Sequence, residues 1–295
     1  MCNNHIHINA EAVDPTRMKT EREAMLIRIR KVMRGVLKDA ILWVKEQKEQ
    51  GLYNDSPESK RMLAQKVAQL KQKAMHRIHL ELLNSGETTV GWWLSNYIDN
   101  AYRKGVNRAV SLLHSSGIKI KGAEELQSKN TVSFLYNRPE SIARRDALDL
   151  GIFSRFNGVC DELVSKIQST VLSGITYGLS PYDVAQSLRK VVKLSSNQAQ
   201  TIARTEMIRA HHTANIQTFR DAGVAGVKVL AEFLTVAGEN GNPVASRVCE
   251  KCWELQKKSE NKPYTLDEAE KLIPVHPNCR CVVIPVLPEV EEKSS

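Results

Sequence analysis

The sequence predicts a mainly α-helical fold of long helices, followed by a small C-terminal α+β module of zinc-knuckle type. Apolar residues recur at helical spacing over long stretches without proline, which is typical of amphipathic helices. Aromatic residues are only 5% of the 295 residues, which favours helices packed through aliphatic side chains over a β-sandwich. Four of the six cysteines lie within the last fifty residues, where the apolar pattern becomes strand-like.

The N-terminal region begins with one long amphipathic helix, predicted over residues 18–50. The sequence NDSPES then indicates a turn in which Ser56 is the N-cap and Pro57 the first residue of a second helix. This helix runs to about Leu83, and a third is predicted from Thr88 to His114. Short polar turns between long helices indicate an antiparallel helical assembly.

The central region is predicted to be helical after a looser stretch at residues 115–130. Ser180 is the expected N-cap, and Pro181 the first residue, of a helix over PYDVAQSLRKVV. A separate helix is predicted from about Ser196 to Ala222, ending at Gly223, since glycine is common just after a helix.

The C-terminal module combines short strands with a short helix. GVKVLAEFLTV is strand-like, a short helix is predicted over residues 265–272, and VVIPV forms a closing strand that Pro285 places at a sheet edge. These patterns divide the chain into a flexible N-terminus (1–17), a basic helical region (18–125), a central helical region (126–223), the cysteine-rich module (224–288) and a disordered tail (289–295).

The positive charge of the chain is concentrated near its start. Between Arg17 and His79 there are sixteen Lys or Arg against seven Asp or Glu, which equals the formal +9 of the whole chain. Such a segment can contact DNA phosphates without reading sequence, or an acidic protein surface, although a solvated helical face is the simplest interpretation of any single lysine. The candidate contact residues are Arg28, Arg30, Lys31, Arg34 and Lys38.

The chain has no run of about 18 apolar residues, so no membrane span is predicted. Its polar first residues lack the apolar core of a secretory signal, and we expect a protein made in a cytoplasm. Because that compartment disfavours disulfides, clustered cysteines there indicate metal ligands or redox groups.

The clustered cysteines predict a closed structural zinc site. A tetrahedral zinc ion takes four ligands, usually two from each of two turns. VCEKC supplies one pair, and four of the five candidates Cys249, Cys252, His276, Cys279 and Cys281 would hold the ion. A redox-labile disulfide, or simply buried thiols, is the main alternative, and a catalytic zinc with an open position is a third. Arg280 would lie in the surrounding hydrogen-bond network.

The helix that carries IARTEMIRAHHTAN is predicted to brace the cysteine module through a polar network that includes Arg204 and Glu206. Glu206 as a general base beside the metal is the functional alternative. His211 and His212 are adjacent and point to different sides of a helix, so they are weak candidates for metal ligands.

In this order, IARTE, VCEKC and HPNCRC resemble the motifs of the Mu F-like phage head morphogenesis family, the minor capsid proteins of tailed phages. GITYGLSPYDVAQSLRK is also similar to that family's helical lead-in, so the resemblance covers roughly residues 153–286. The matching positions are Ala203, Arg204, Thr205, Glu206, Cys249, Cys252, His276, Pro277, Asn278, Cys279, Arg280 and Cys281.

The resemblance implies a structural virion component rather than an enzyme, assembled in the host cytoplasm and located inside the capsid. It implies the portal or major capsid protein as partner, an oligomer set by portal or capsid symmetry, no membrane, and a role in head assembly and in DNA packaging or ejection. A zinc-module nucleic-acid-binding protein is the alternative function, and a metal-dependent hydrolase or nuclease is a further one.

The chain departs from the family pattern at three places. Phe233 stands where the family often has tryptophan, and Ala245 replaces an acidic residue after a lengthened loop at residues 238–243. Gln256 and Lys257 stand where a glycine is common.

Overall fold

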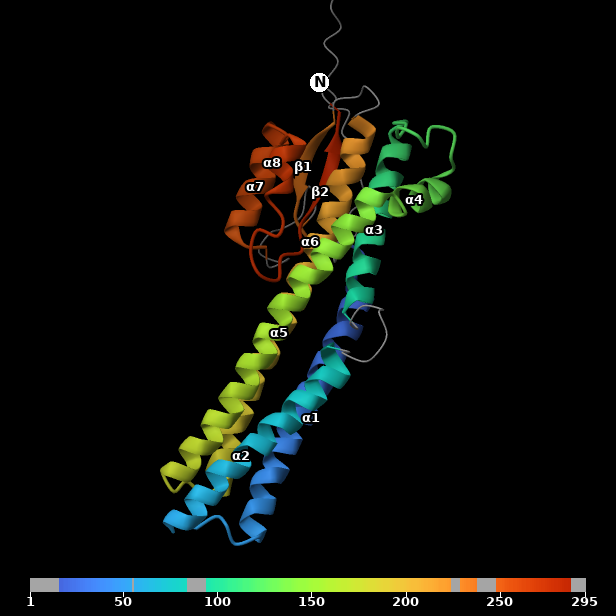
Figure 1. The fold of residues 1–295 in the computed structure, drawn as a ribbon. Helices are drawn as coiled ribbons and strands as arrows, with labels where there is room; N and C mark the ends of the chain where they lie inside the picture. Colours follow the sequence, from blue (N-terminus) through green and yellow to red (C-terminus); the bar gives the residue numbers. More distant parts are fainter. Residues whose placement is uncertain (1–15, 55, 84–93, 224–228, 238–247, 288–295) are drawn as a thin grey trace, which may run out of the picture. The chain divides into compact units, whose positions relative to one another are not determined.

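The computed structural model describes residues 16–54, 56–83, 94–223, 229–237 and 248–287, and it is mainly helical with a small C-terminal strand pair (Figure 1). The predicted mainly helical class is therefore confirmed. The helices are α1 (Lys19–Glu49), α2 (Pro57–Ile78), the π-helix η1 (His79–Leu83), α3 (Ser95–Ser115), α4 (Ser128–Tyr136), α5 (Pro139–Thr176), α6 (Pro181–Gly223), α7 (Glu250–Asn261) and α8 (Leu266–Glu270). The strands are β1 (Leu230–Leu234) and β2 (Val282–Val286).

The chain forms two compact units that are interleaved in sequence. Unit 1 comprises residues 1–22, 97–149 and 204–295, and unit 2 comprises residues 23–96 and 150–203. The boundaries fall within α1, α3, α5 and α6, so each of these helices contributes residues to both units. The predicted regions, by contrast, follow one another along the chain, and that division stays a prediction.

Unit 2 is a helical bundle to which α1, α2, α5 and α6 contribute (Figure 1). The predicted start of α2 is confirmed, since the Ser56 side chain accepts a hydrogen bond from Ser59 N at 3.2 Å and Pro57 is the first helical residue. Arg77 of α2 reaches α1, where its Nε donates to Asp39 at 2.6 Å. The remaining inward face of α2 is apolar and buried, comprising Leu63, Val67, Leu70, Ala74 and Ile78.

The two long helices α5 and α6 meet at a tight turn within unit 2. A Cβ atom at Gly174 would lie 2.4 Å from Val184 Cγ2, so the absence of a side chain allows this close approach. Ser180 caps α6 as predicted, with its Oγ accepting from Asp183 N at 3.2 Å.

The prediction of two separate helices between residues 181 and 223 is wrong, because α6 is continuous through LSSN. Ser195 and Ser196 read as a helix start, but both are buried inside α6. Gln200 donates to the Ser196 carbonyl at 3.1 Å and to its Oγ at 3.2 Å, so the serine is bonded within the helix rather than serving as a cap. Since no glycine or proline interrupts this stretch, burial outweighs the weak local capping signal.

Unit 1 packs α3 closely against α6. A Cβ atom at Gly105 would lie 2.3 Å from the His211 carbonyl oxygen and 2.8 Å from Ala214 Cβ. Asp99 of α3 binds Arg145 Nη1 at 2.5 Å and also accepts a hydrogen bond from the hydroxyl of Tyr136. The glycine and the charged cluster fix the packing of α3 on its neighbours.

The C-terminal module belongs to unit 1 and gathers α7, α8, β1 and β2 beside the C-terminal part of α6, in orange and red in Figure 1. The two strands are antiparallel, with Leu230 opposite Val286 and Leu234 opposite Val282. Both strands and the short helix near residues 265–272 are confirmed. The predicted edge position of Pro285 also holds among the described residues, where β2 pairs only with β1.

One helix of the module, α7, was not predicted. CWELQKKSEN is polar and highly charged, and the Cys-x2-Cys spacing indicates a turn rather than a helix start. In the structure Cys249 is itself the N-cap of α7, with its Sγ accepting from Cys252 N at 3.4 Å. Sulfur is an uncommon capping group, which is why sequence rules overlooked it.

Several sequence predictions fall outside the described residues. These are the flexible start up to residue 15, the start of the third helix at Thr88, the loop at 238–243 with Ala245, and the tail from 289 onward. Among the described residues, no helix combines the length and apolarity that a membrane crossing requires.

Replacing Gly105 with alanine is expected to lower the free energy of unfolding by about 1–3 kcal/mol, because the new methyl group would overlap backbone that cannot move freely. Denaturant unfolding of the purified protein measures the change. Gly158→Ala in α5 is the matched control, since a Cβ there meets no atom within 4 Å and helix propensity improves by roughly 0.5–1 kcal/mol. Equal stability of both variants would contradict the packing described for α3 and α6.

Candidate metal centre

The first cysteine pair lies at the start of α7. Cys249 is exposed at the N-cap, and Cys252 is buried in the first turn. The N-terminus of a helix carries a partial positive charge and free N–H groups, which stabilise thiolates. VCEKC is thus held as a rigid pair by the helix that it begins.

The second group of candidates lies on the loop that leads into β2. The loop closes through a hydrogen bond from Cys279 N to the His276 carbonyl at 3.1 Å, with Asn278 at a left-handed φ of 62°. Cys279 and Cys281 are buried, and His276 is half-buried. Cys281 directly precedes β2, so pairing of β2 with β1 fixes this end of the loop.

The structure brings all five predicted ligands together as two overlapping groups. The ligand atoms of Cys249, Cys252 and His276 lie within 4.8 Å of one another, and so do those of Cys252, Cys279 and Cys281. Cys252 belongs to both groups, so it is the centre of the cluster. None of these four cysteines forms a disulfide.

His276 is oriented with one ring nitrogen toward the cluster. Its Nδ1 lies 2.8 Å from the Pro277 carbonyl oxygen, which can only accept, so Nδ1 carries the proton. In the neutral imidazole Nε2 then has a lone pair, and this nitrogen faces the Cys252 sulfur at 3.3 Å. A hydrogen bond to the far nitrogen is the usual way in which a metal-binding histidine is held in place.

The cluster favours a thiolate at Cys279. Hydrogen bonds from the thiols of Cys252 and Cys281 lower the pKa of Cys279. The hydrogen bond between Cys252 and Cys279 is the main cause that raises the pKa of Cys252, and a hydrogen bond with Cys281 and burial raise it further. A buried thiolate beside the two further sulfur atoms of Cys252 and Cys281 suits a soft or borderline cation.

The loop between the two groups rests on α6. Asn278 N donates to Thr205 Oγ1 at 3.2 Å, and Arg204 Nη1 donates to Asn278 Oδ1 at 3.5 Å. Two residues of IARTE therefore contact the middle of HPNCRC. The left-handed backbone of Asn278 turns both its amide and its side chain toward this helix.

The predicted network residues Glu206 and Arg280 occupy different surroundings. Glu206 is buried, and its carboxylate receives Arg209 Nε at 2.9 Å. Arg280 is half-buried between the two loop cysteines. The metal-binding groups of the described residues include neither Glu206 nor any other carboxylate.

The two histidines of α6 are buried and belong to neither group of candidate ligands. His212 Nε2 donates to the Ala269 carbonyl at 3.0 Å, which ties α8 to α6. Burial lowers the pKa of His212 to about 4, and burial together with Arg108 lowers that of His211 to about 3. Both imidazoles are therefore neutral packing groups at neutral pH.

Residues 165–284 match the family model described as Phage Mu protein F like protein. This segment is Mu F-like. The match confirms the resemblance carried by IARTE, VCEKC and HPNCRC, and it includes every candidate metal ligand. No curated protein and no solved structure matches the chain.

Sequence reasoning missed two residues that anchor α7 in the Mu F-like segment. Gln256 Oε1 accepts from Thr235 N at 2.9 Å, and Ser259 Oγ accepts from Phe233 N at 2.9 Å. Both side chains are buried and satisfy backbone groups at and just beyond the end of β1. A glycine at position 256 could not make this contact, because the hydrogen bond to Thr235 N comes from the Gln256 side chain.

The five predicted basic contact residues lie on α1 of unit 2, apart from the candidate ligands in sequence and in compact unit. Arg28 donates to the Glu81 carbonyl at 3.2 Å, and Arg30 lies 3.8 Å from Glu23. Lys31, Arg34 and Lys38 are exposed.

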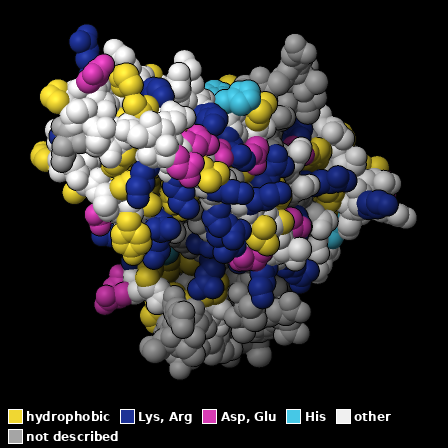
Figure 2. Space-filling model, turned by 90° about the horizontal axis from the view of Figure 1, so that it is seen from below, with side chains coloured by type: hydrophobic (Ala, Val, Ile, Leu, Met, Phe, Trp, Pro, Cys, Tyr) yellow, Lys and Arg dark blue, Asp and Glu magenta, His cyan; other side chains and the backbone are white. Residues whose placement is uncertain are grey.

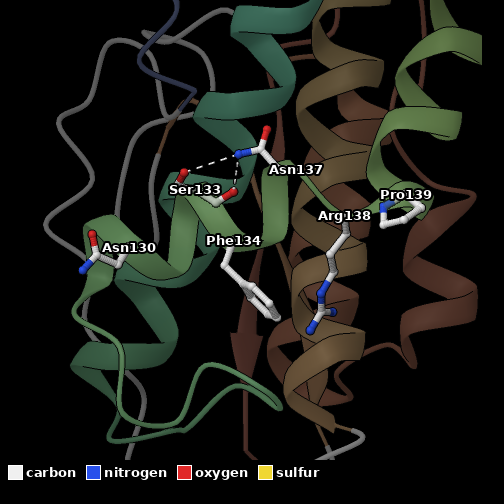
Figure 3. A pocket seen from close by; sticks show the side chains of 6 residues that line it. All are labelled: Asn130, Ser133, Phe134, Asn137, Arg138 and Pro139. Carbon is white, nitrogen blue, oxygen red and sulfur yellow. Dashed lines mark hydrogen bonds between the residues drawn. The ribbon is translucent and has the colours of Figure 1, made fainter.

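A surface recess of about 470 Å³ lies beside α4 within unit 1 (Figure 3). Its cation, Arg138, donates to the Lys121 carbonyl at 3.0 Å, pairs with Asp221 at 3.3 Å, and lies 4.6 Å from the centre of the Phe134 ring. Asn137 donates to the Ser133 carbonyl at 2.9 Å. Arg138 and Asn137 thus already have partners within the protein, and their contacts fix the end of α4. The recess is therefore a structural feature of the packing rather than a candidate binding site.

Gln256→Ala is expected to lower the free energy of unfolding by about 1–3 kcal/mol, because the buried amide of Thr235 would lose its hydrogen-bond partner. Hydrogen exchange at Thr235 N and thermal unfolding measure the loss. Glu254→Ala, an exposed position on the same helix, should change stability by less than about 0.5 kcal/mol. Unchanged protection of the Thr235 amide in Gln256→Ala would overturn this role.

Proposed function

We propose that this chain is a structural minor head protein of a tailed phage or prophage. The observation that supports it is the Mu F-like match over residues 165–284. Within this segment the loop HPNCRC lies beside VCEKC at the start of α7 and is hydrogen-bonded to IARTE of α6. The Mu F-like family is one of phage head morphogenesis. In this role the protein acts by binding and assembly, and the cysteine and histidine side chains of the segment stabilise its fold.

The same proposal includes a closed zinc site held by four of Cys249, Cys252, His276, Cys279 and Cys281. Four zinc ligands with bonds of about 2.0–2.3 Å lie roughly 3.5–4 Å from one another. Within each group of three the ligand atoms are at most 4.8 Å apart, and the two groups, which share Cys252, would have to approach one another to hold one ion. A sulfur-rich set with one imidazole matches the ligand preference of zinc.

Zinc would stabilise a module that has little core of its own. Its sheet consists of two strands of five residues each, and its helices α7 and α8 are short. Small units of this kind usually need a metal, a disulfide or a partner to stay folded. By joining the start of α7 to the loop before β2, a bound ion would cross-link elements some thirty residues apart in sequence.

We assign the portal or the major capsid protein as partner, inside the capsid, with an oligomeric state set by their symmetry. The basic face of α1 would contact either packaged DNA or an acidic surface of the portal. Lys31 and Lys38 have no acidic partner among the described residues, so they are available for either contact.

A hydrolase built on Glu206 is less well supported. Its carboxylate is only 3% exposed, is bonded to Arg209, and belongs to neither metal-binding group. A catalytic zinc would also need an open position, whereas five candidates compete here for four places.

Purified protein is expected to contain about one zinc per chain by mass spectrometry, and Cys252→Ser should lose it together with folding of the module. Among single variants of the other four candidates, three should lose the metal and one should retain it, which identifies the group that is not a ligand. Cys160→Ser, at a buried free cysteine of α5, is the matched control and should keep its zinc. Absence of metal from the wild-type protein would refute the site.

Heads purified from the phage that encodes this chain should contain the protein in few copies relative to the major capsid protein. Cys252→Ser should reduce both its incorporation and the yield of infectious particles, because the module would not fold. Lys71→Gln, an exposed change on α2, should leave both unchanged. Heads that lack the wild-type protein would rule out the structural role.

A further inference from the structure

A groove of about 470 Å³ lies within unit 2 between α1 and α6, remote in sequence from the cysteine cluster. Its floor is apolar: Met33 and Val192 are almost completely buried, Leu37 is half-buried, and Ile27 leaves 57% of its surface exposed. An isoleucine this exposed beside other apolar side chains is a recurrent feature of binding grooves.

The rim of the groove is strongly basic. Arg30 and Arg34 border it on α1, and Arg189 and Lys193 border it on α6. These spacings of four residues place each pair on one face of its helix. Figure 2, which views one face of the molecule, shows dark blue Lys and Arg side chains gathered with yellow hydrophobic and magenta Asp and Glu side chains among them.

The positive charge of the rim is largely uncompensated. The sequence has no Asp or Glu from Ala24 to Lys38, and none from Val184 to Thr205. Arg30 lies 3.8 Å from Glu23 in an exposed pair, which neutralises little. Neither Arg189 nor Lys193 has an acidic partner in the part of the chain that the structure describes.

We propose that this groove binds an amphipathic, acidic helix of a partner protein. The apolar face of such a helix would cover Ile27 and the floor, while its carboxylates would pair with the four rim cations. Duplex DNA would satisfy the cations, but its phosphates offer nothing to an apolar floor. The combination of floor and rim therefore favours a protein segment over nucleic acid.

This inference deepens the partner side of the proposed function, since it chooses between DNA and an acidic protein surface. It concerns unit 2 alone and needs neither zinc nor the cysteine module. Its test uses purified protein and synthetic probes, so the groove can fail while incorporation into heads holds, and the reverse.

The test measures fluorescence anisotropy of a labelled helical peptide of about 18 residues, with leucines at i, i+3, i+4 and i+7 and glutamates on the flanks. A peptide of the same composition in scrambled order, and a DNA duplex of about 20 base pairs, are the comparison probes. The protein is the full chain as wild type, Ile27→Ser, Arg189→Gln and, as matched control, Lys73→Gln on the exposed side of α2.

The amphipathic peptide is expected to bind saturably and more tightly than the scrambled one. Ile27→Ser should weaken that binding about fivefold and Arg189→Gln about tenfold, with Lys73→Gln unchanged and circular dichroism unaltered in all variants. Equal binding of the two peptides, no binding of either, or no effect of Ile27→Ser would overturn the proposal. DNA binding that falls with Arg189→Gln but not with Lys73→Gln, without peptide binding, would overturn the proposal and assign the face to nucleic acid instead.

Discussion

The Cys/His cluster depends on the position of one sulfur atom, that of Cys252. It belongs to both groups of candidate ligands, and it faces His276 Nε2 at 3.3 Å. Its position is set by the first turn of α7, which Cys249 caps through sulfur. The helix in turn is fixed to β1 by Gln256 and Ser259. The strand β1, the helix α7 and the Cys/His cluster are therefore connected, so a substitution that moves β1 or α7 would also move the candidate ligands.

The second half of the cluster is fixed from another direction. Asn278 joins its loop to Thr205 and Arg204 of α6, and Cys281 continues directly into β2. The three motifs IARTE, VCEKC and HPNCRC are separated in sequence, yet all three lie at or beside the Cys/His cluster. This arrangement gives IARTE a physical role that needs no catalysis: Arg204 and Thr205 orient the loop, and Glu206 is neutralised by Arg209.

Most of the fold was predictable because its signals are local. Ser56 and Ser180 are helix caps as their sequences indicate, and the strands at residues 230–234 and 282–286 show a clear apolar pattern. The failures arose where tertiary contacts outweigh local preference. Ser196 resembles a cap but is buried within α6, and α7 is too polar to show a periodic face. The five ligand candidates were evident from spacing, whereas the roles of Gln256 and Ser259 depend on the backbone of a distant strand.

The two units use opposite chemistry, and this bears on how the protein can function in assembly. The cysteine module turns its reactive groups inward, since Cys252, Cys279 and Cys281 are buried and a metal would occupy them fully. In unit 2, by contrast, the apolar side chain of Ile27 and the cations of the groove rim are exposed to solvent. A closed centre has little left to offer a partner, whereas an apolar groove with uncompensated charge has both area and specificity to offer. The proposed recognition of an acidic partner therefore lies in the groove of unit 2, and the proposed zinc ion would stabilise the fold of the cysteine module.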